Sequence, residues 1–208
     1  MSGMTCDPPG VRAAVAVRRL GHELVNHRPD ATILDRIAAV AEDLATAVAA
    51  TPLRLRPPGE TLERLAQPVP HDGALLDHGS VCPVSGAENP LGPALAAWRE
   101  GDAVRATVTL GPAHAGSRGI AHGGVIAALF DDLMGFVMDS LAKTQGFTAS
   151  LTVSYRKPVP IGTEIELRGR LRCTQGRKLF IVATMELAGA MLAEAEALFV
   201  GVAASSGA

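Results

Sequence analysis

The feature that most constrains this fold is an apolar run from Val125 to Leu141, whose large side chains fall on every side of a helix. A helix that is apolar all round must be buried all round. At about 1.5 Å per residue, a run of this length makes a helix roughly 30 Å long, about the width of a small domain. The run is therefore expected to form the core of a domain.

Two acids interrupt this run, and a glycine-rich turn, Gly119–Gly124, precedes it. An ionised carboxylate is costly in apolar surroundings, so at least one of Asp131 and Asp132 needs partners or solvent. The turn would place free backbone N–H groups at the helix start, which suits the binding of negative charge or the polarisation of a carbonyl oxygen. The alternative is that both acids face solvent or cap a neighbouring element.

The string His122-Gly123-Gly124, with an acid nine residues after the histidine, resembles the signature of hotdog-fold acyl-CoA thioesterases of the phenylacetate-pathway (PaaI-like) group. The resemblance runs from about Cys82 to Val202. It is closest to the branch of thioesterase superfamily members that carry an N-terminal extension. Further matching segments are Thr148–Leu151, Ser154–Pro160, Gly176–Phe180 and Ala195–Val200. The sequence departs from many relatives at Gly116, where they carry an asparagine.

The resemblance implies a site shared by two subunits, in which an acid of one subunit acts on a thioester held against the helix start of the other. It makes Asp131 the general base or nucleophile, and His122 a positioning residue whose alternative role is to cap the helix or fill the core. The residues assigned to catalysis are Asp131, His122, Gly123, Gly124 and Thr148. Those assigned to the coenzyme A part of the substrate are Ser154, Arg156, Lys157, Arg177 and Lys178, of which Lys157 is the loosest match.

Composition and motifs exclude several other classes of protein. The chain has 208 residues, is 48% hydrophobic and has a formal net charge of −2, which gives no argument for nucleic acid. Its three cysteines show no CxxC spacing, so no disulfide framework, zinc site or other metal site is predicted, and a cytoplasmic location is expected. The segment His71–Pro93 contains His78 and Cys82 but fits a loop better than a metal site. No membrane span is predicted, and no cofactor is expected beyond the coenzyme A of the substrate.

Periodicity predicts an N-terminal helical part and a C-terminal sheet. Residues Met1–Gly10 are expected to be disordered. Residues Val11–Ala50 are expected to form one or two helices with Asp30 as an N-cap, and Thr51–Pro70 to form the connector between these helices and the rest of the chain. The apolar face of the second helix is expected to pack on its own domain or on a second subunit, with docking of another protein as the alternative. Strands are predicted at residues 103–110, 147–155, 163–174 and 177–187.

Strict alternation in residues 147–155 puts Phe147, Ala149 and Leu151 on one face and Thr148 on the other. Residues 188–202 favour helix by propensity, but their alternating alanines and the resemblance both indicate a final strand. The prediction is an α+β hotdog fold, with an antiparallel sheet wrapped around one long helix. Residues 1–70 would form the extension and linker, and residues 71–208 the domain.

The predicted function is hydrolysis of an acyl-CoA thioester in fatty acid metabolism, by a homodimer or a homotetramer built as a dimer of dimers. The first alternative is a non-catalytic regulator that binds acyl-CoA or lipid and uses the helical extension for docking. A hotdog hydratase acting on enoyl-CoA is a further alternative, but it would need a different placement of the acid and the histidine.

Overall fold

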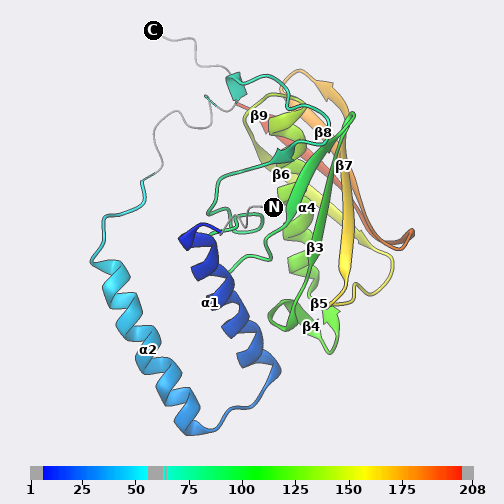
Figure 1. The fold of residues 1–208 in the computed structure, drawn as a ribbon. Helices are drawn as coiled ribbons and strands as arrows, with labels where there is room; N and C mark the ends of the chain where they lie inside the picture. Colours follow the sequence, from blue (N-terminus) through cyan, green and yellow to red (C-terminus); the bar gives the residue numbers. More distant parts are fainter. Residues whose placement is uncertain (1–6, 56–62, 64, 203–208) are drawn as a thin grey trace, which may run out of the picture.

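A computed structural model describes residues 7–55, 63 and 65–202 of the chain. Its centre is helix α4 (Gly123–Ser140), which lies against a seven-stranded sheet (Figure 1). The strand order is β1-β2-β3-β7-β8-β9-β6, and every neighbouring pair is antiparallel. The strands are β1 (Leu75–Leu76), β2 (Ala96–Glu100), β3 (Ala103–Thr109), β6 (Gly146–Tyr155), β7 (Glu164–Gln175), β8 (Lys178–Leu187) and β9 (Ala190–Gly201). This arrangement confirms the predicted α+β hotdog fold.

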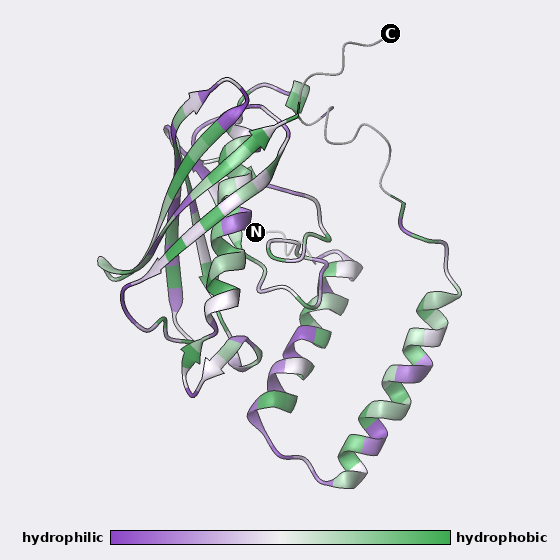
Figure 2. Cartoon of the chain, turned by 180° about the vertical axis from the view of Figure 1, so that it is seen from behind, coloured by the Kyte–Doolittle hydropathy of each residue, from purple (hydrophilic) through white to green (hydrophobic). Residues whose placement is uncertain are grey.

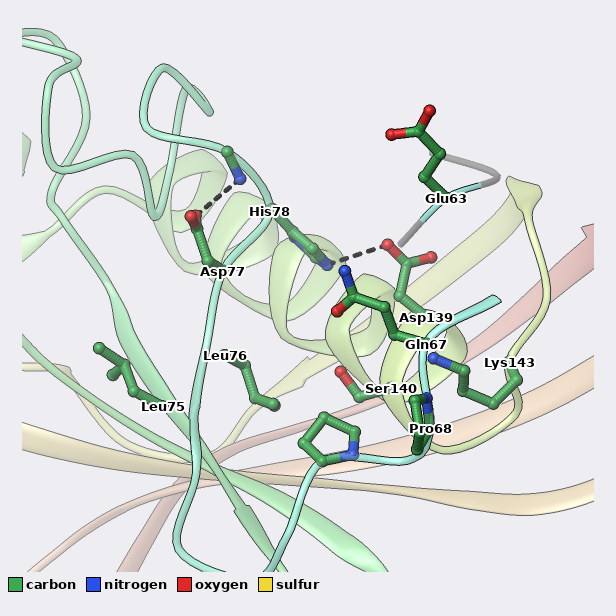
Figure 3. Close-up of a pocket in the computed structure, with 12 residues that line it drawn as sticks. Glu63, Gln67, Pro68, Leu75, Leu76, Asp77, His78, Asp139, Ser140 and Lys143 are labelled. Carbon is green, nitrogen blue, oxygen red and sulfur yellow. Dashed lines mark hydrogen bonds and ion pairs between the residues drawn. The ribbon is translucent and has the colours of Figure 1, made fainter. Parts of the chain in front are cut away.

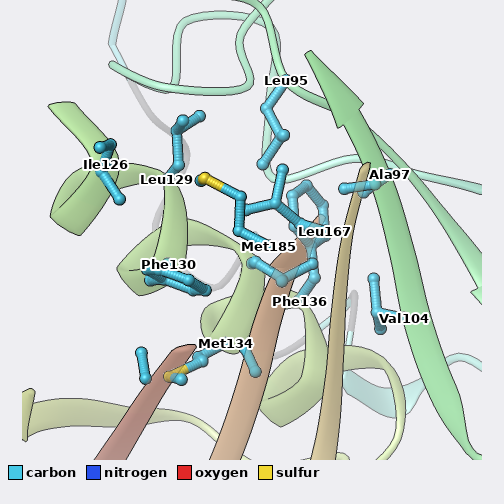
Figure 4. Close-up of a cluster of buried hydrophobic side chains, with 14 of the residues drawn as sticks. Leu95, Ala97, Val104, Ile126, Leu129, Phe130, Met134, Phe136, Leu167 and Met185 are labelled. Carbon is cyan, nitrogen blue, oxygen red and sulfur yellow. The ribbon is translucent and has the colours of Figure 1, made fainter. Parts of the chain in front are cut away.

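The core lies between α4 and the face of the sheet that the helix covers (Figure 4). Phe130 and Met134 of α4 are fully buried, as are Leu167 of β7 and Met185 of β8. Burying one such side chain contributes about 1.5–3 kcal/mol. The apolar run is therefore buried along its length, as predicted from its lack of a polar face.

Residues 188–202 favour helix by propensity and strand by alternation, and the structure shows a strand. Residues 190–201 form β9 between β8 and β6, with Ala193, Ala195 and Ala197 buried. Their neighbours Glu194 and Glu196 lie on the outer face of the sheet, where Glu196 pairs with Arg172. Hydrogen bonding to strands on both sides outweighs the helix propensity of this segment. The strand prediction is confirmed.

Four short strands were not predicted. β1 and β2 extend the sheet beyond β3, and β4 (Ala115–Ser117) and β5 (Ile120–Ala121) form a separate two-stranded sheet beside the start of α4. A short 3-10 helix, η1 (Pro112–His114), precedes β4. β1, β4 and β5 are too short to display an alternation of apolar and polar residues, and the five residues of β2 do not alternate.

The N-terminal part forms two helices, α1 (Pro9–Asn26) and α2 (Ala31–Ala49), as predicted. The expectation of disorder is wrong for Pro9 and Gly10, which form the first turn of α1, where a proline is tolerated. The Asp30 side chain caps α2 by accepting a hydrogen bond from the Ile33 N–H at 2.9 Å. However, α2 buries none of its residues, and it stands apart from the sheet with its hydrophobic residues uncovered (Figure 2). The expectation that this helix packs on its own domain is therefore wrong for the single chain, and packing on a second subunit stays a prediction.

Parts of the N-terminal prediction lie outside the described residues. These parts are residues 1–6 of the segment expected to be disordered, and residues 56–62 and 64 of the expected connector. The division of the chain at residue 70 also stays a prediction. Of the helices that the structure describes, none combines the length and the apolar character needed to cross a membrane.

Candidate functional site

The first part of the site is the start of α4, where His122 is the N-cap residue. Its Nδ1 accepts a hydrogen bond from the Gly124 N–H at 2.9 Å, and its carbonyl oxygen accepts from Val125 and Ile126 at 3.0 and 3.2 Å. Within the described residues, the Gly123 N–H of this first turn donates to no acceptor. The helix start therefore offers one free donor at Gly123, and not the pair of glycine donors expected from the sequence.

Tyr155, at the end of β6, adds a contact to the same turn. Its hydroxyl donates a hydrogen bond to the Gly123 carbonyl oxygen at 2.9 Å. A Cβ at position 123 would lie 3.4 Å from that hydroxyl oxygen, so a glycine allows the close approach. Tyr155 is not among the site residues predicted from the sequence, because one aromatic residue at a strand end is no functional signal by itself.

The second part of the site is the carboxylate of Asp131, which lies two and a half turns along α4. The Thr148 hydroxyl donates a hydrogen bond to Asp131 Oδ1 at 2.7 Å. Thr148 was one of the residues assigned to the site, and the structure brings these two side chains together. An acid that interrupts an apolar helix thus has a specific polar partner on the neighbouring strand.

Thr148 reaches Asp131 because of a β-bulge. The register of β6 against β9 shifts between Thr148, opposite Phe199, and Ser150, opposite Leu198. Phe199 is buried on the helix-facing side of the sheet, so its partner Thr148 faces α4 as well. Strict alternation wrongly placed Thr148 on the face opposite to Leu151. The extra residue in the bulge turns the hydroxyl toward the carboxylate.

Asp131 and the start of α4 do not meet within one chain. Gly123 and Asp131 are eight residues apart on the same helix, which corresponds to about 12 Å along its axis. Thr148 lies near the beginning of β6 and Tyr155 at its end, so the two parts of the site mark opposite ends of this strand. β6 is also the last strand of the sheet, with one edge not paired within the described chain.

The residues assigned to coenzyme A lie in two separate places. Ser154 and Arg156 line a groove of about 1140 Å³ on the outer face of the sheet, and Arg156 Nε donates to Glu194 Oε1 at 2.9 Å. Lys157 follows β6 directly and is exposed. Arg177 and Lys178 belong to the β7–β8 hairpin, beside the other end of β6. One chain therefore does not bring the basic residues together, and their contact with ligand stays a prediction.

A second group of polar side chains, which the sequence did not predict, joins the loop before β2 to the middle of α4. Asp132 Oδ1 lies 3.1 Å from Cys82 Sγ and 3.4 Å from His78 Nδ1. His78 also borders a cavity of about 400 Å³ together with Asp139 (Figure 3). The partners of Asp132 are some fifty residues away in the chain, so no local spacing could indicate this cluster.

Burial and the contacts within this cluster shift the pKa values of His78, Asp132 and Cys82. Burial alone would lower the pKa of His78, but hydrogen bonds with Asp132 and Cys82 and the charges of Asp132 and Asp139 raise it to about 9. Burial would raise the pKa of the Asp132 carboxyl, yet its contacts with His78 lower it overall. Burial would also raise the pKa of the Cys82 thiol. The hydrogen bond with His78 lowers it, and the net effect is a lowered pKa.

Comparison with known proteins agrees with this architecture. Residues 118–194, which include His122, Asp131 and Thr148, match the Thioesterase superfamily. A solved structure described as a thioesterase superfamily protein has a TM-score of 0.77 and 27% sequence identity to this chain, and the match covers 94% of this chain and 92% of that one. The domain has the hotdog fold of the thioesterase superfamily. Because this match covers nearly the whole of the present chain, it includes the N-terminal helices as well as the hotdog domain.

The hotdog domain is also similar to curated proteins named acyl-coenzyme A thioesterase THEM4. The protein from Mus musculus is 32% identical over 87 residues, which are 41% of this chain and 37% of that protein. The protein from Xenopus laevis is 36% identical over 70 residues, which are 34% of this chain and 31% of that protein. The matched segments thus span less than two fifths of the length of these relatives.

Proposed function

We propose that this hotdog protein is an acyl-CoA thioesterase, which hydrolyses an acyl-CoA thioester to a free acid and coenzyme A. The observation that carries the proposal is the 2.7 Å hydrogen bond from Thr148 to Asp131, which holds a carboxylate in a fixed orientation on an otherwise apolar helix. The relatives named acyl-coenzyme A thioesterase THEM4 support the same substrate class. The reaction needs no cofactor beyond the coenzyme A that the substrate carries, and we expect it to serve fatty acid metabolism in the cytoplasm.

The chemistry divides between the two parts of the site. The carbonyl oxygen of the thioester accepts a hydrogen bond from the Gly123 N–H, where the partial positive charge of the helix start stabilises the developing oxyanion. Asp131 takes a proton from a water molecule as the resulting hydroxide adds to the carbonyl carbon, or its carboxylate adds to that carbon itself. The carbon–sulfur bond then breaks, and coenzyme A leaves as the thiolate. On the first route this step gives the free acid directly, and on the second it leaves a mixed anhydride with Asp131, which water hydrolyses to the free acid and the restored carboxylate. His122 positions the turn by holding the Gly124 N–H.

Both parts can act on one substrate only if two chains contribute them. Reacting atoms must approach to about 3–3.5 Å, far less than the separation of Gly123 and Asp131 along α4. Antiparallel pairing of two β6 edges would set the start of one strand beside the end of the other. Thr148 and Asp131 of one copy would then lie near Tyr155 and Gly123 of a second copy. We therefore propose a homodimer with two composite sites, alone or within a dimer of dimers.

The same pairing bears on the coenzyme A contacts. Arg177 and Lys178 lie beside the beginning of β6, and Ser154, Arg156 and Lys157 lie at its end. Two antiparallel copies would bring these basic groups toward one another, where guanidinium and ammonium groups suit the phosphates of coenzyme A. Arg156 would have to exchange its contact with Glu194 for the ligand.

The test is release of free thiol from short, medium, long and aromatic acyl-CoAs by the purified protein and by Asp131→Asn. We expect Asp131→Asn to lower kcat at least hundredfold, which corresponds to about 2.7 kcal/mol of transition-state stabilisation. Asp43→Asn, on the exposed α2, is the matched control and should retain full activity. Binding of acyl-CoA without turnover by the unaltered protein would instead favour the non-catalytic regulator.

A further inference from the structure

The cluster around Asp132 has the donor atoms of a metal site. A ring nitrogen of His78, Cys82 Sγ and a carboxylate oxygen of Asp132 all lie within 4.8 Å of one another. The side chains of His78 and Asp132 are 13% and 10% exposed, and Cys82 is 7% exposed. A buried imidazole, thiol and carboxylate that converge on one point provide the three kinds of protein ligand that Zn²⁺ takes.

We propose that His78, Cys82 and Asp132 bind a zinc ion that clamps the loop before β2 to the middle of α4. Bonds of about 2.0–2.3 Å to a tetrahedral Zn²⁺ put neighbouring donors roughly 3.3–3.8 Å apart. The distances from Asp132 Oδ1 to His78 Nδ1 and to Cys82 Sγ are 3.4 and 3.1 Å, so small adjustments suffice. Three protein ligands leave the fourth position for water.

The surroundings of His78 are those of an oriented metal ligand. Its other ring nitrogen, Nε2, lies 3.6 Å from Asp139 Oδ2, and a metal-binding histidine commonly directs its second nitrogen at a carboxylate. The ring stacks on Phe136, with centroids 3.5 Å apart and an angle of 6° between the planes. A Cβ at Gly135 would lie 3.1 Å from the imidazole, so the helix carries a glycine where the ring comes closest.

The loop that supplies two of the ligands is held by its own hydrogen bonds. The Gly86 N–H donates to the Cys82 carbonyl oxygen at 3.0 Å, and a Cβ at position 86 would lie 2.4 Å from the Cys82 nitrogen. The Asn89 side chain donates to the Val81 carbonyl oxygen at 3.2 Å. The position of the thiol is therefore set by the loop before any ion binds.

One buried atom indicates that protein groups alone do not complete this cluster. Within the described residues, Asp132 Oδ2 is buried and makes no hydrogen bond, which is costly for a carboxylate oxygen. A cation at the cluster would neutralise the Asp132 carboxylate. The cavity reaches His78 and Asp139, but its lining does not include Cys82, so an acyl substrate would not reach the thiol through it. A small ion fits these facts better than a nucleophilic cysteine.

The experiment treats the purified chain with chelator, adds one equivalent of ZnCl₂, removes free metal and measures zinc by mass spectrometry. We expect about one zinc per chain. We also expect Cys82→Ser and Asp132→Asn to lose it, and Cys173→Ser, which alters an exposed thiol on β7, to retain it. Asp139→Asn should weaken zinc binding about 10- to 100-fold by removing the partner of His78.

Substitutions of buried residues can disturb folding, so a second measurement uses the unaltered chain. Titration with CoCl₂ should produce a thiolate-to-cobalt charge-transfer band that saturates at about one equivalent and that added ZnCl₂ abolishes. Failure to retain zinc, or cobalt binding without this band, would overturn the proposal. Neither measurement involves acyl-CoA, so the outcome is independent of the thioesterase assay.

Discussion

At the scale of single residues, the environment separates two adjacent acids. Asp131 lies toward β6 and accepts one hydrogen bond from Thr148, whereas Asp132 points to the loop before β2 and contacts His78 and Cys82. Successive residues on a helix point about 100° apart, so the pair serves two different partners. Only the surroundings distinguish the proposed catalytic acid from the proposed metal ligand.

The hydroxyl of Thr148 should matter for turnover and little for stability, because the residue is exposed. Thr148→Val keeps the shape but removes a hydrogen bond to a charged group, which is worth about 1.5–3 kcal/mol and predicts a loss in kcat of roughly 10- to 150-fold. Thr148→Ser keeps the hydroxyl and should lose much less. Thr109→Val makes the same change at an exposed position on β3 and serves as the control. Equal kcat values for Thr148→Val and Thr109→Val would show that Thr148 has no role in the site.

The family resemblance marks Gly116 as a departure from many relatives, and the structure gives a physical reason for a glycine there. A Cβ at this position would lie 2.9 Å from the Cα and 3.1 Å from the Cβ of His122. We expect Gly116→Asn to displace the N-cap histidine and raise KM, because the helix start then no longer presents the Gly123 N–H correctly. Gly119→Asn lies in the turn after β4 and has no neighbour within 4 Å; its φ of +74° is one that asparagine tolerates better than most residues, so this variant separates the clash from a general effect on the loop. An unchanged KM in Gly116→Asn would contradict the argument.

At the scale of elements, α1 docks on η1 through two histidines that both act as acceptors. His22 Nδ1 accepts from the Ala113 N–H at 3.0 Å, and His114 Nδ1 accepts from the Gly111 N–H at 3.1 Å. The rings lie 4.9 Å apart. Burial and the charge of Arg18 lower the pKa of His22, and the charge of Glu23 partly opposes this. Burial and the charges of His22 and Arg18 lower the pKa of His114. Protonation would therefore remove two acceptors and place two cations side by side.

This contact predicts that α1 loosens in mild acid. Because both folded-state pKa values lie below the ordinary 6.5, the unfolded chain binds more protons, and stability falls as the pH drops below about 6.5. Hydrogen exchange of α1 should accelerate between pH 7.5 and pH 5.5, while that of β8 stays slow. His22→Gln, which offers an acceptor that does not titrate, should reduce this pH dependence. Exchange of α1 that does not change with pH would show that the histidines do not govern docking.

The sequence predicts the long elements well and the local departures poorly. The apolar run, the strands from β6 to β9 and the Asp30 cap follow from periodicity and capping chemistry. The bulge that turns Thr148 toward Asp131 breaks that periodicity by one residue, and nothing local marks it. The cluster of His78, Cys82 and Asp132 depends on tertiary contact across some fifty residues. Local patterns therefore fix which elements form, and the fold determines which side chains meet.

At the scale of the whole molecule, the unpaired edge of β6 is the surface through which we expect two chains to associate. Phe147 at the start of this strand is 71% exposed and Tyr155 at its end is 53% exposed. A long edge strand with uncovered aromatic residues tends to pair with another strand. Antiparallel pairing of two copies at this edge would place the Phe147 end of one strand beside the Tyr155 end of the other and complete both composite sites.

A mixing experiment tests whether each site draws on two chains. Gly123→Pro removes the one free donor, at the first helical position where proline is tolerated, and Gly123→Ala adds a Cβ but keeps the N–H. Each of Gly123→Pro and Asp131→Asn should be inactive alone. Refolded together, they should form mixed dimers in which one of the two sites is intact, so about a quarter of the unaltered activity returns.

The control for this mixture pairs Asp131→Asn with Asp131→Ala, which damages the same part of the site in both chains and should restore nothing. Light scattering must show that every variant remains a dimer, because loss of assembly would also abolish activity. If a site within one chain performed the reaction, the Gly123→Pro and Asp131→Asn mixture would stay as inactive as its components. Recovery of activity in that mixture alone would require Asp131 and the Gly123 N–H to act on one thioester from different chains.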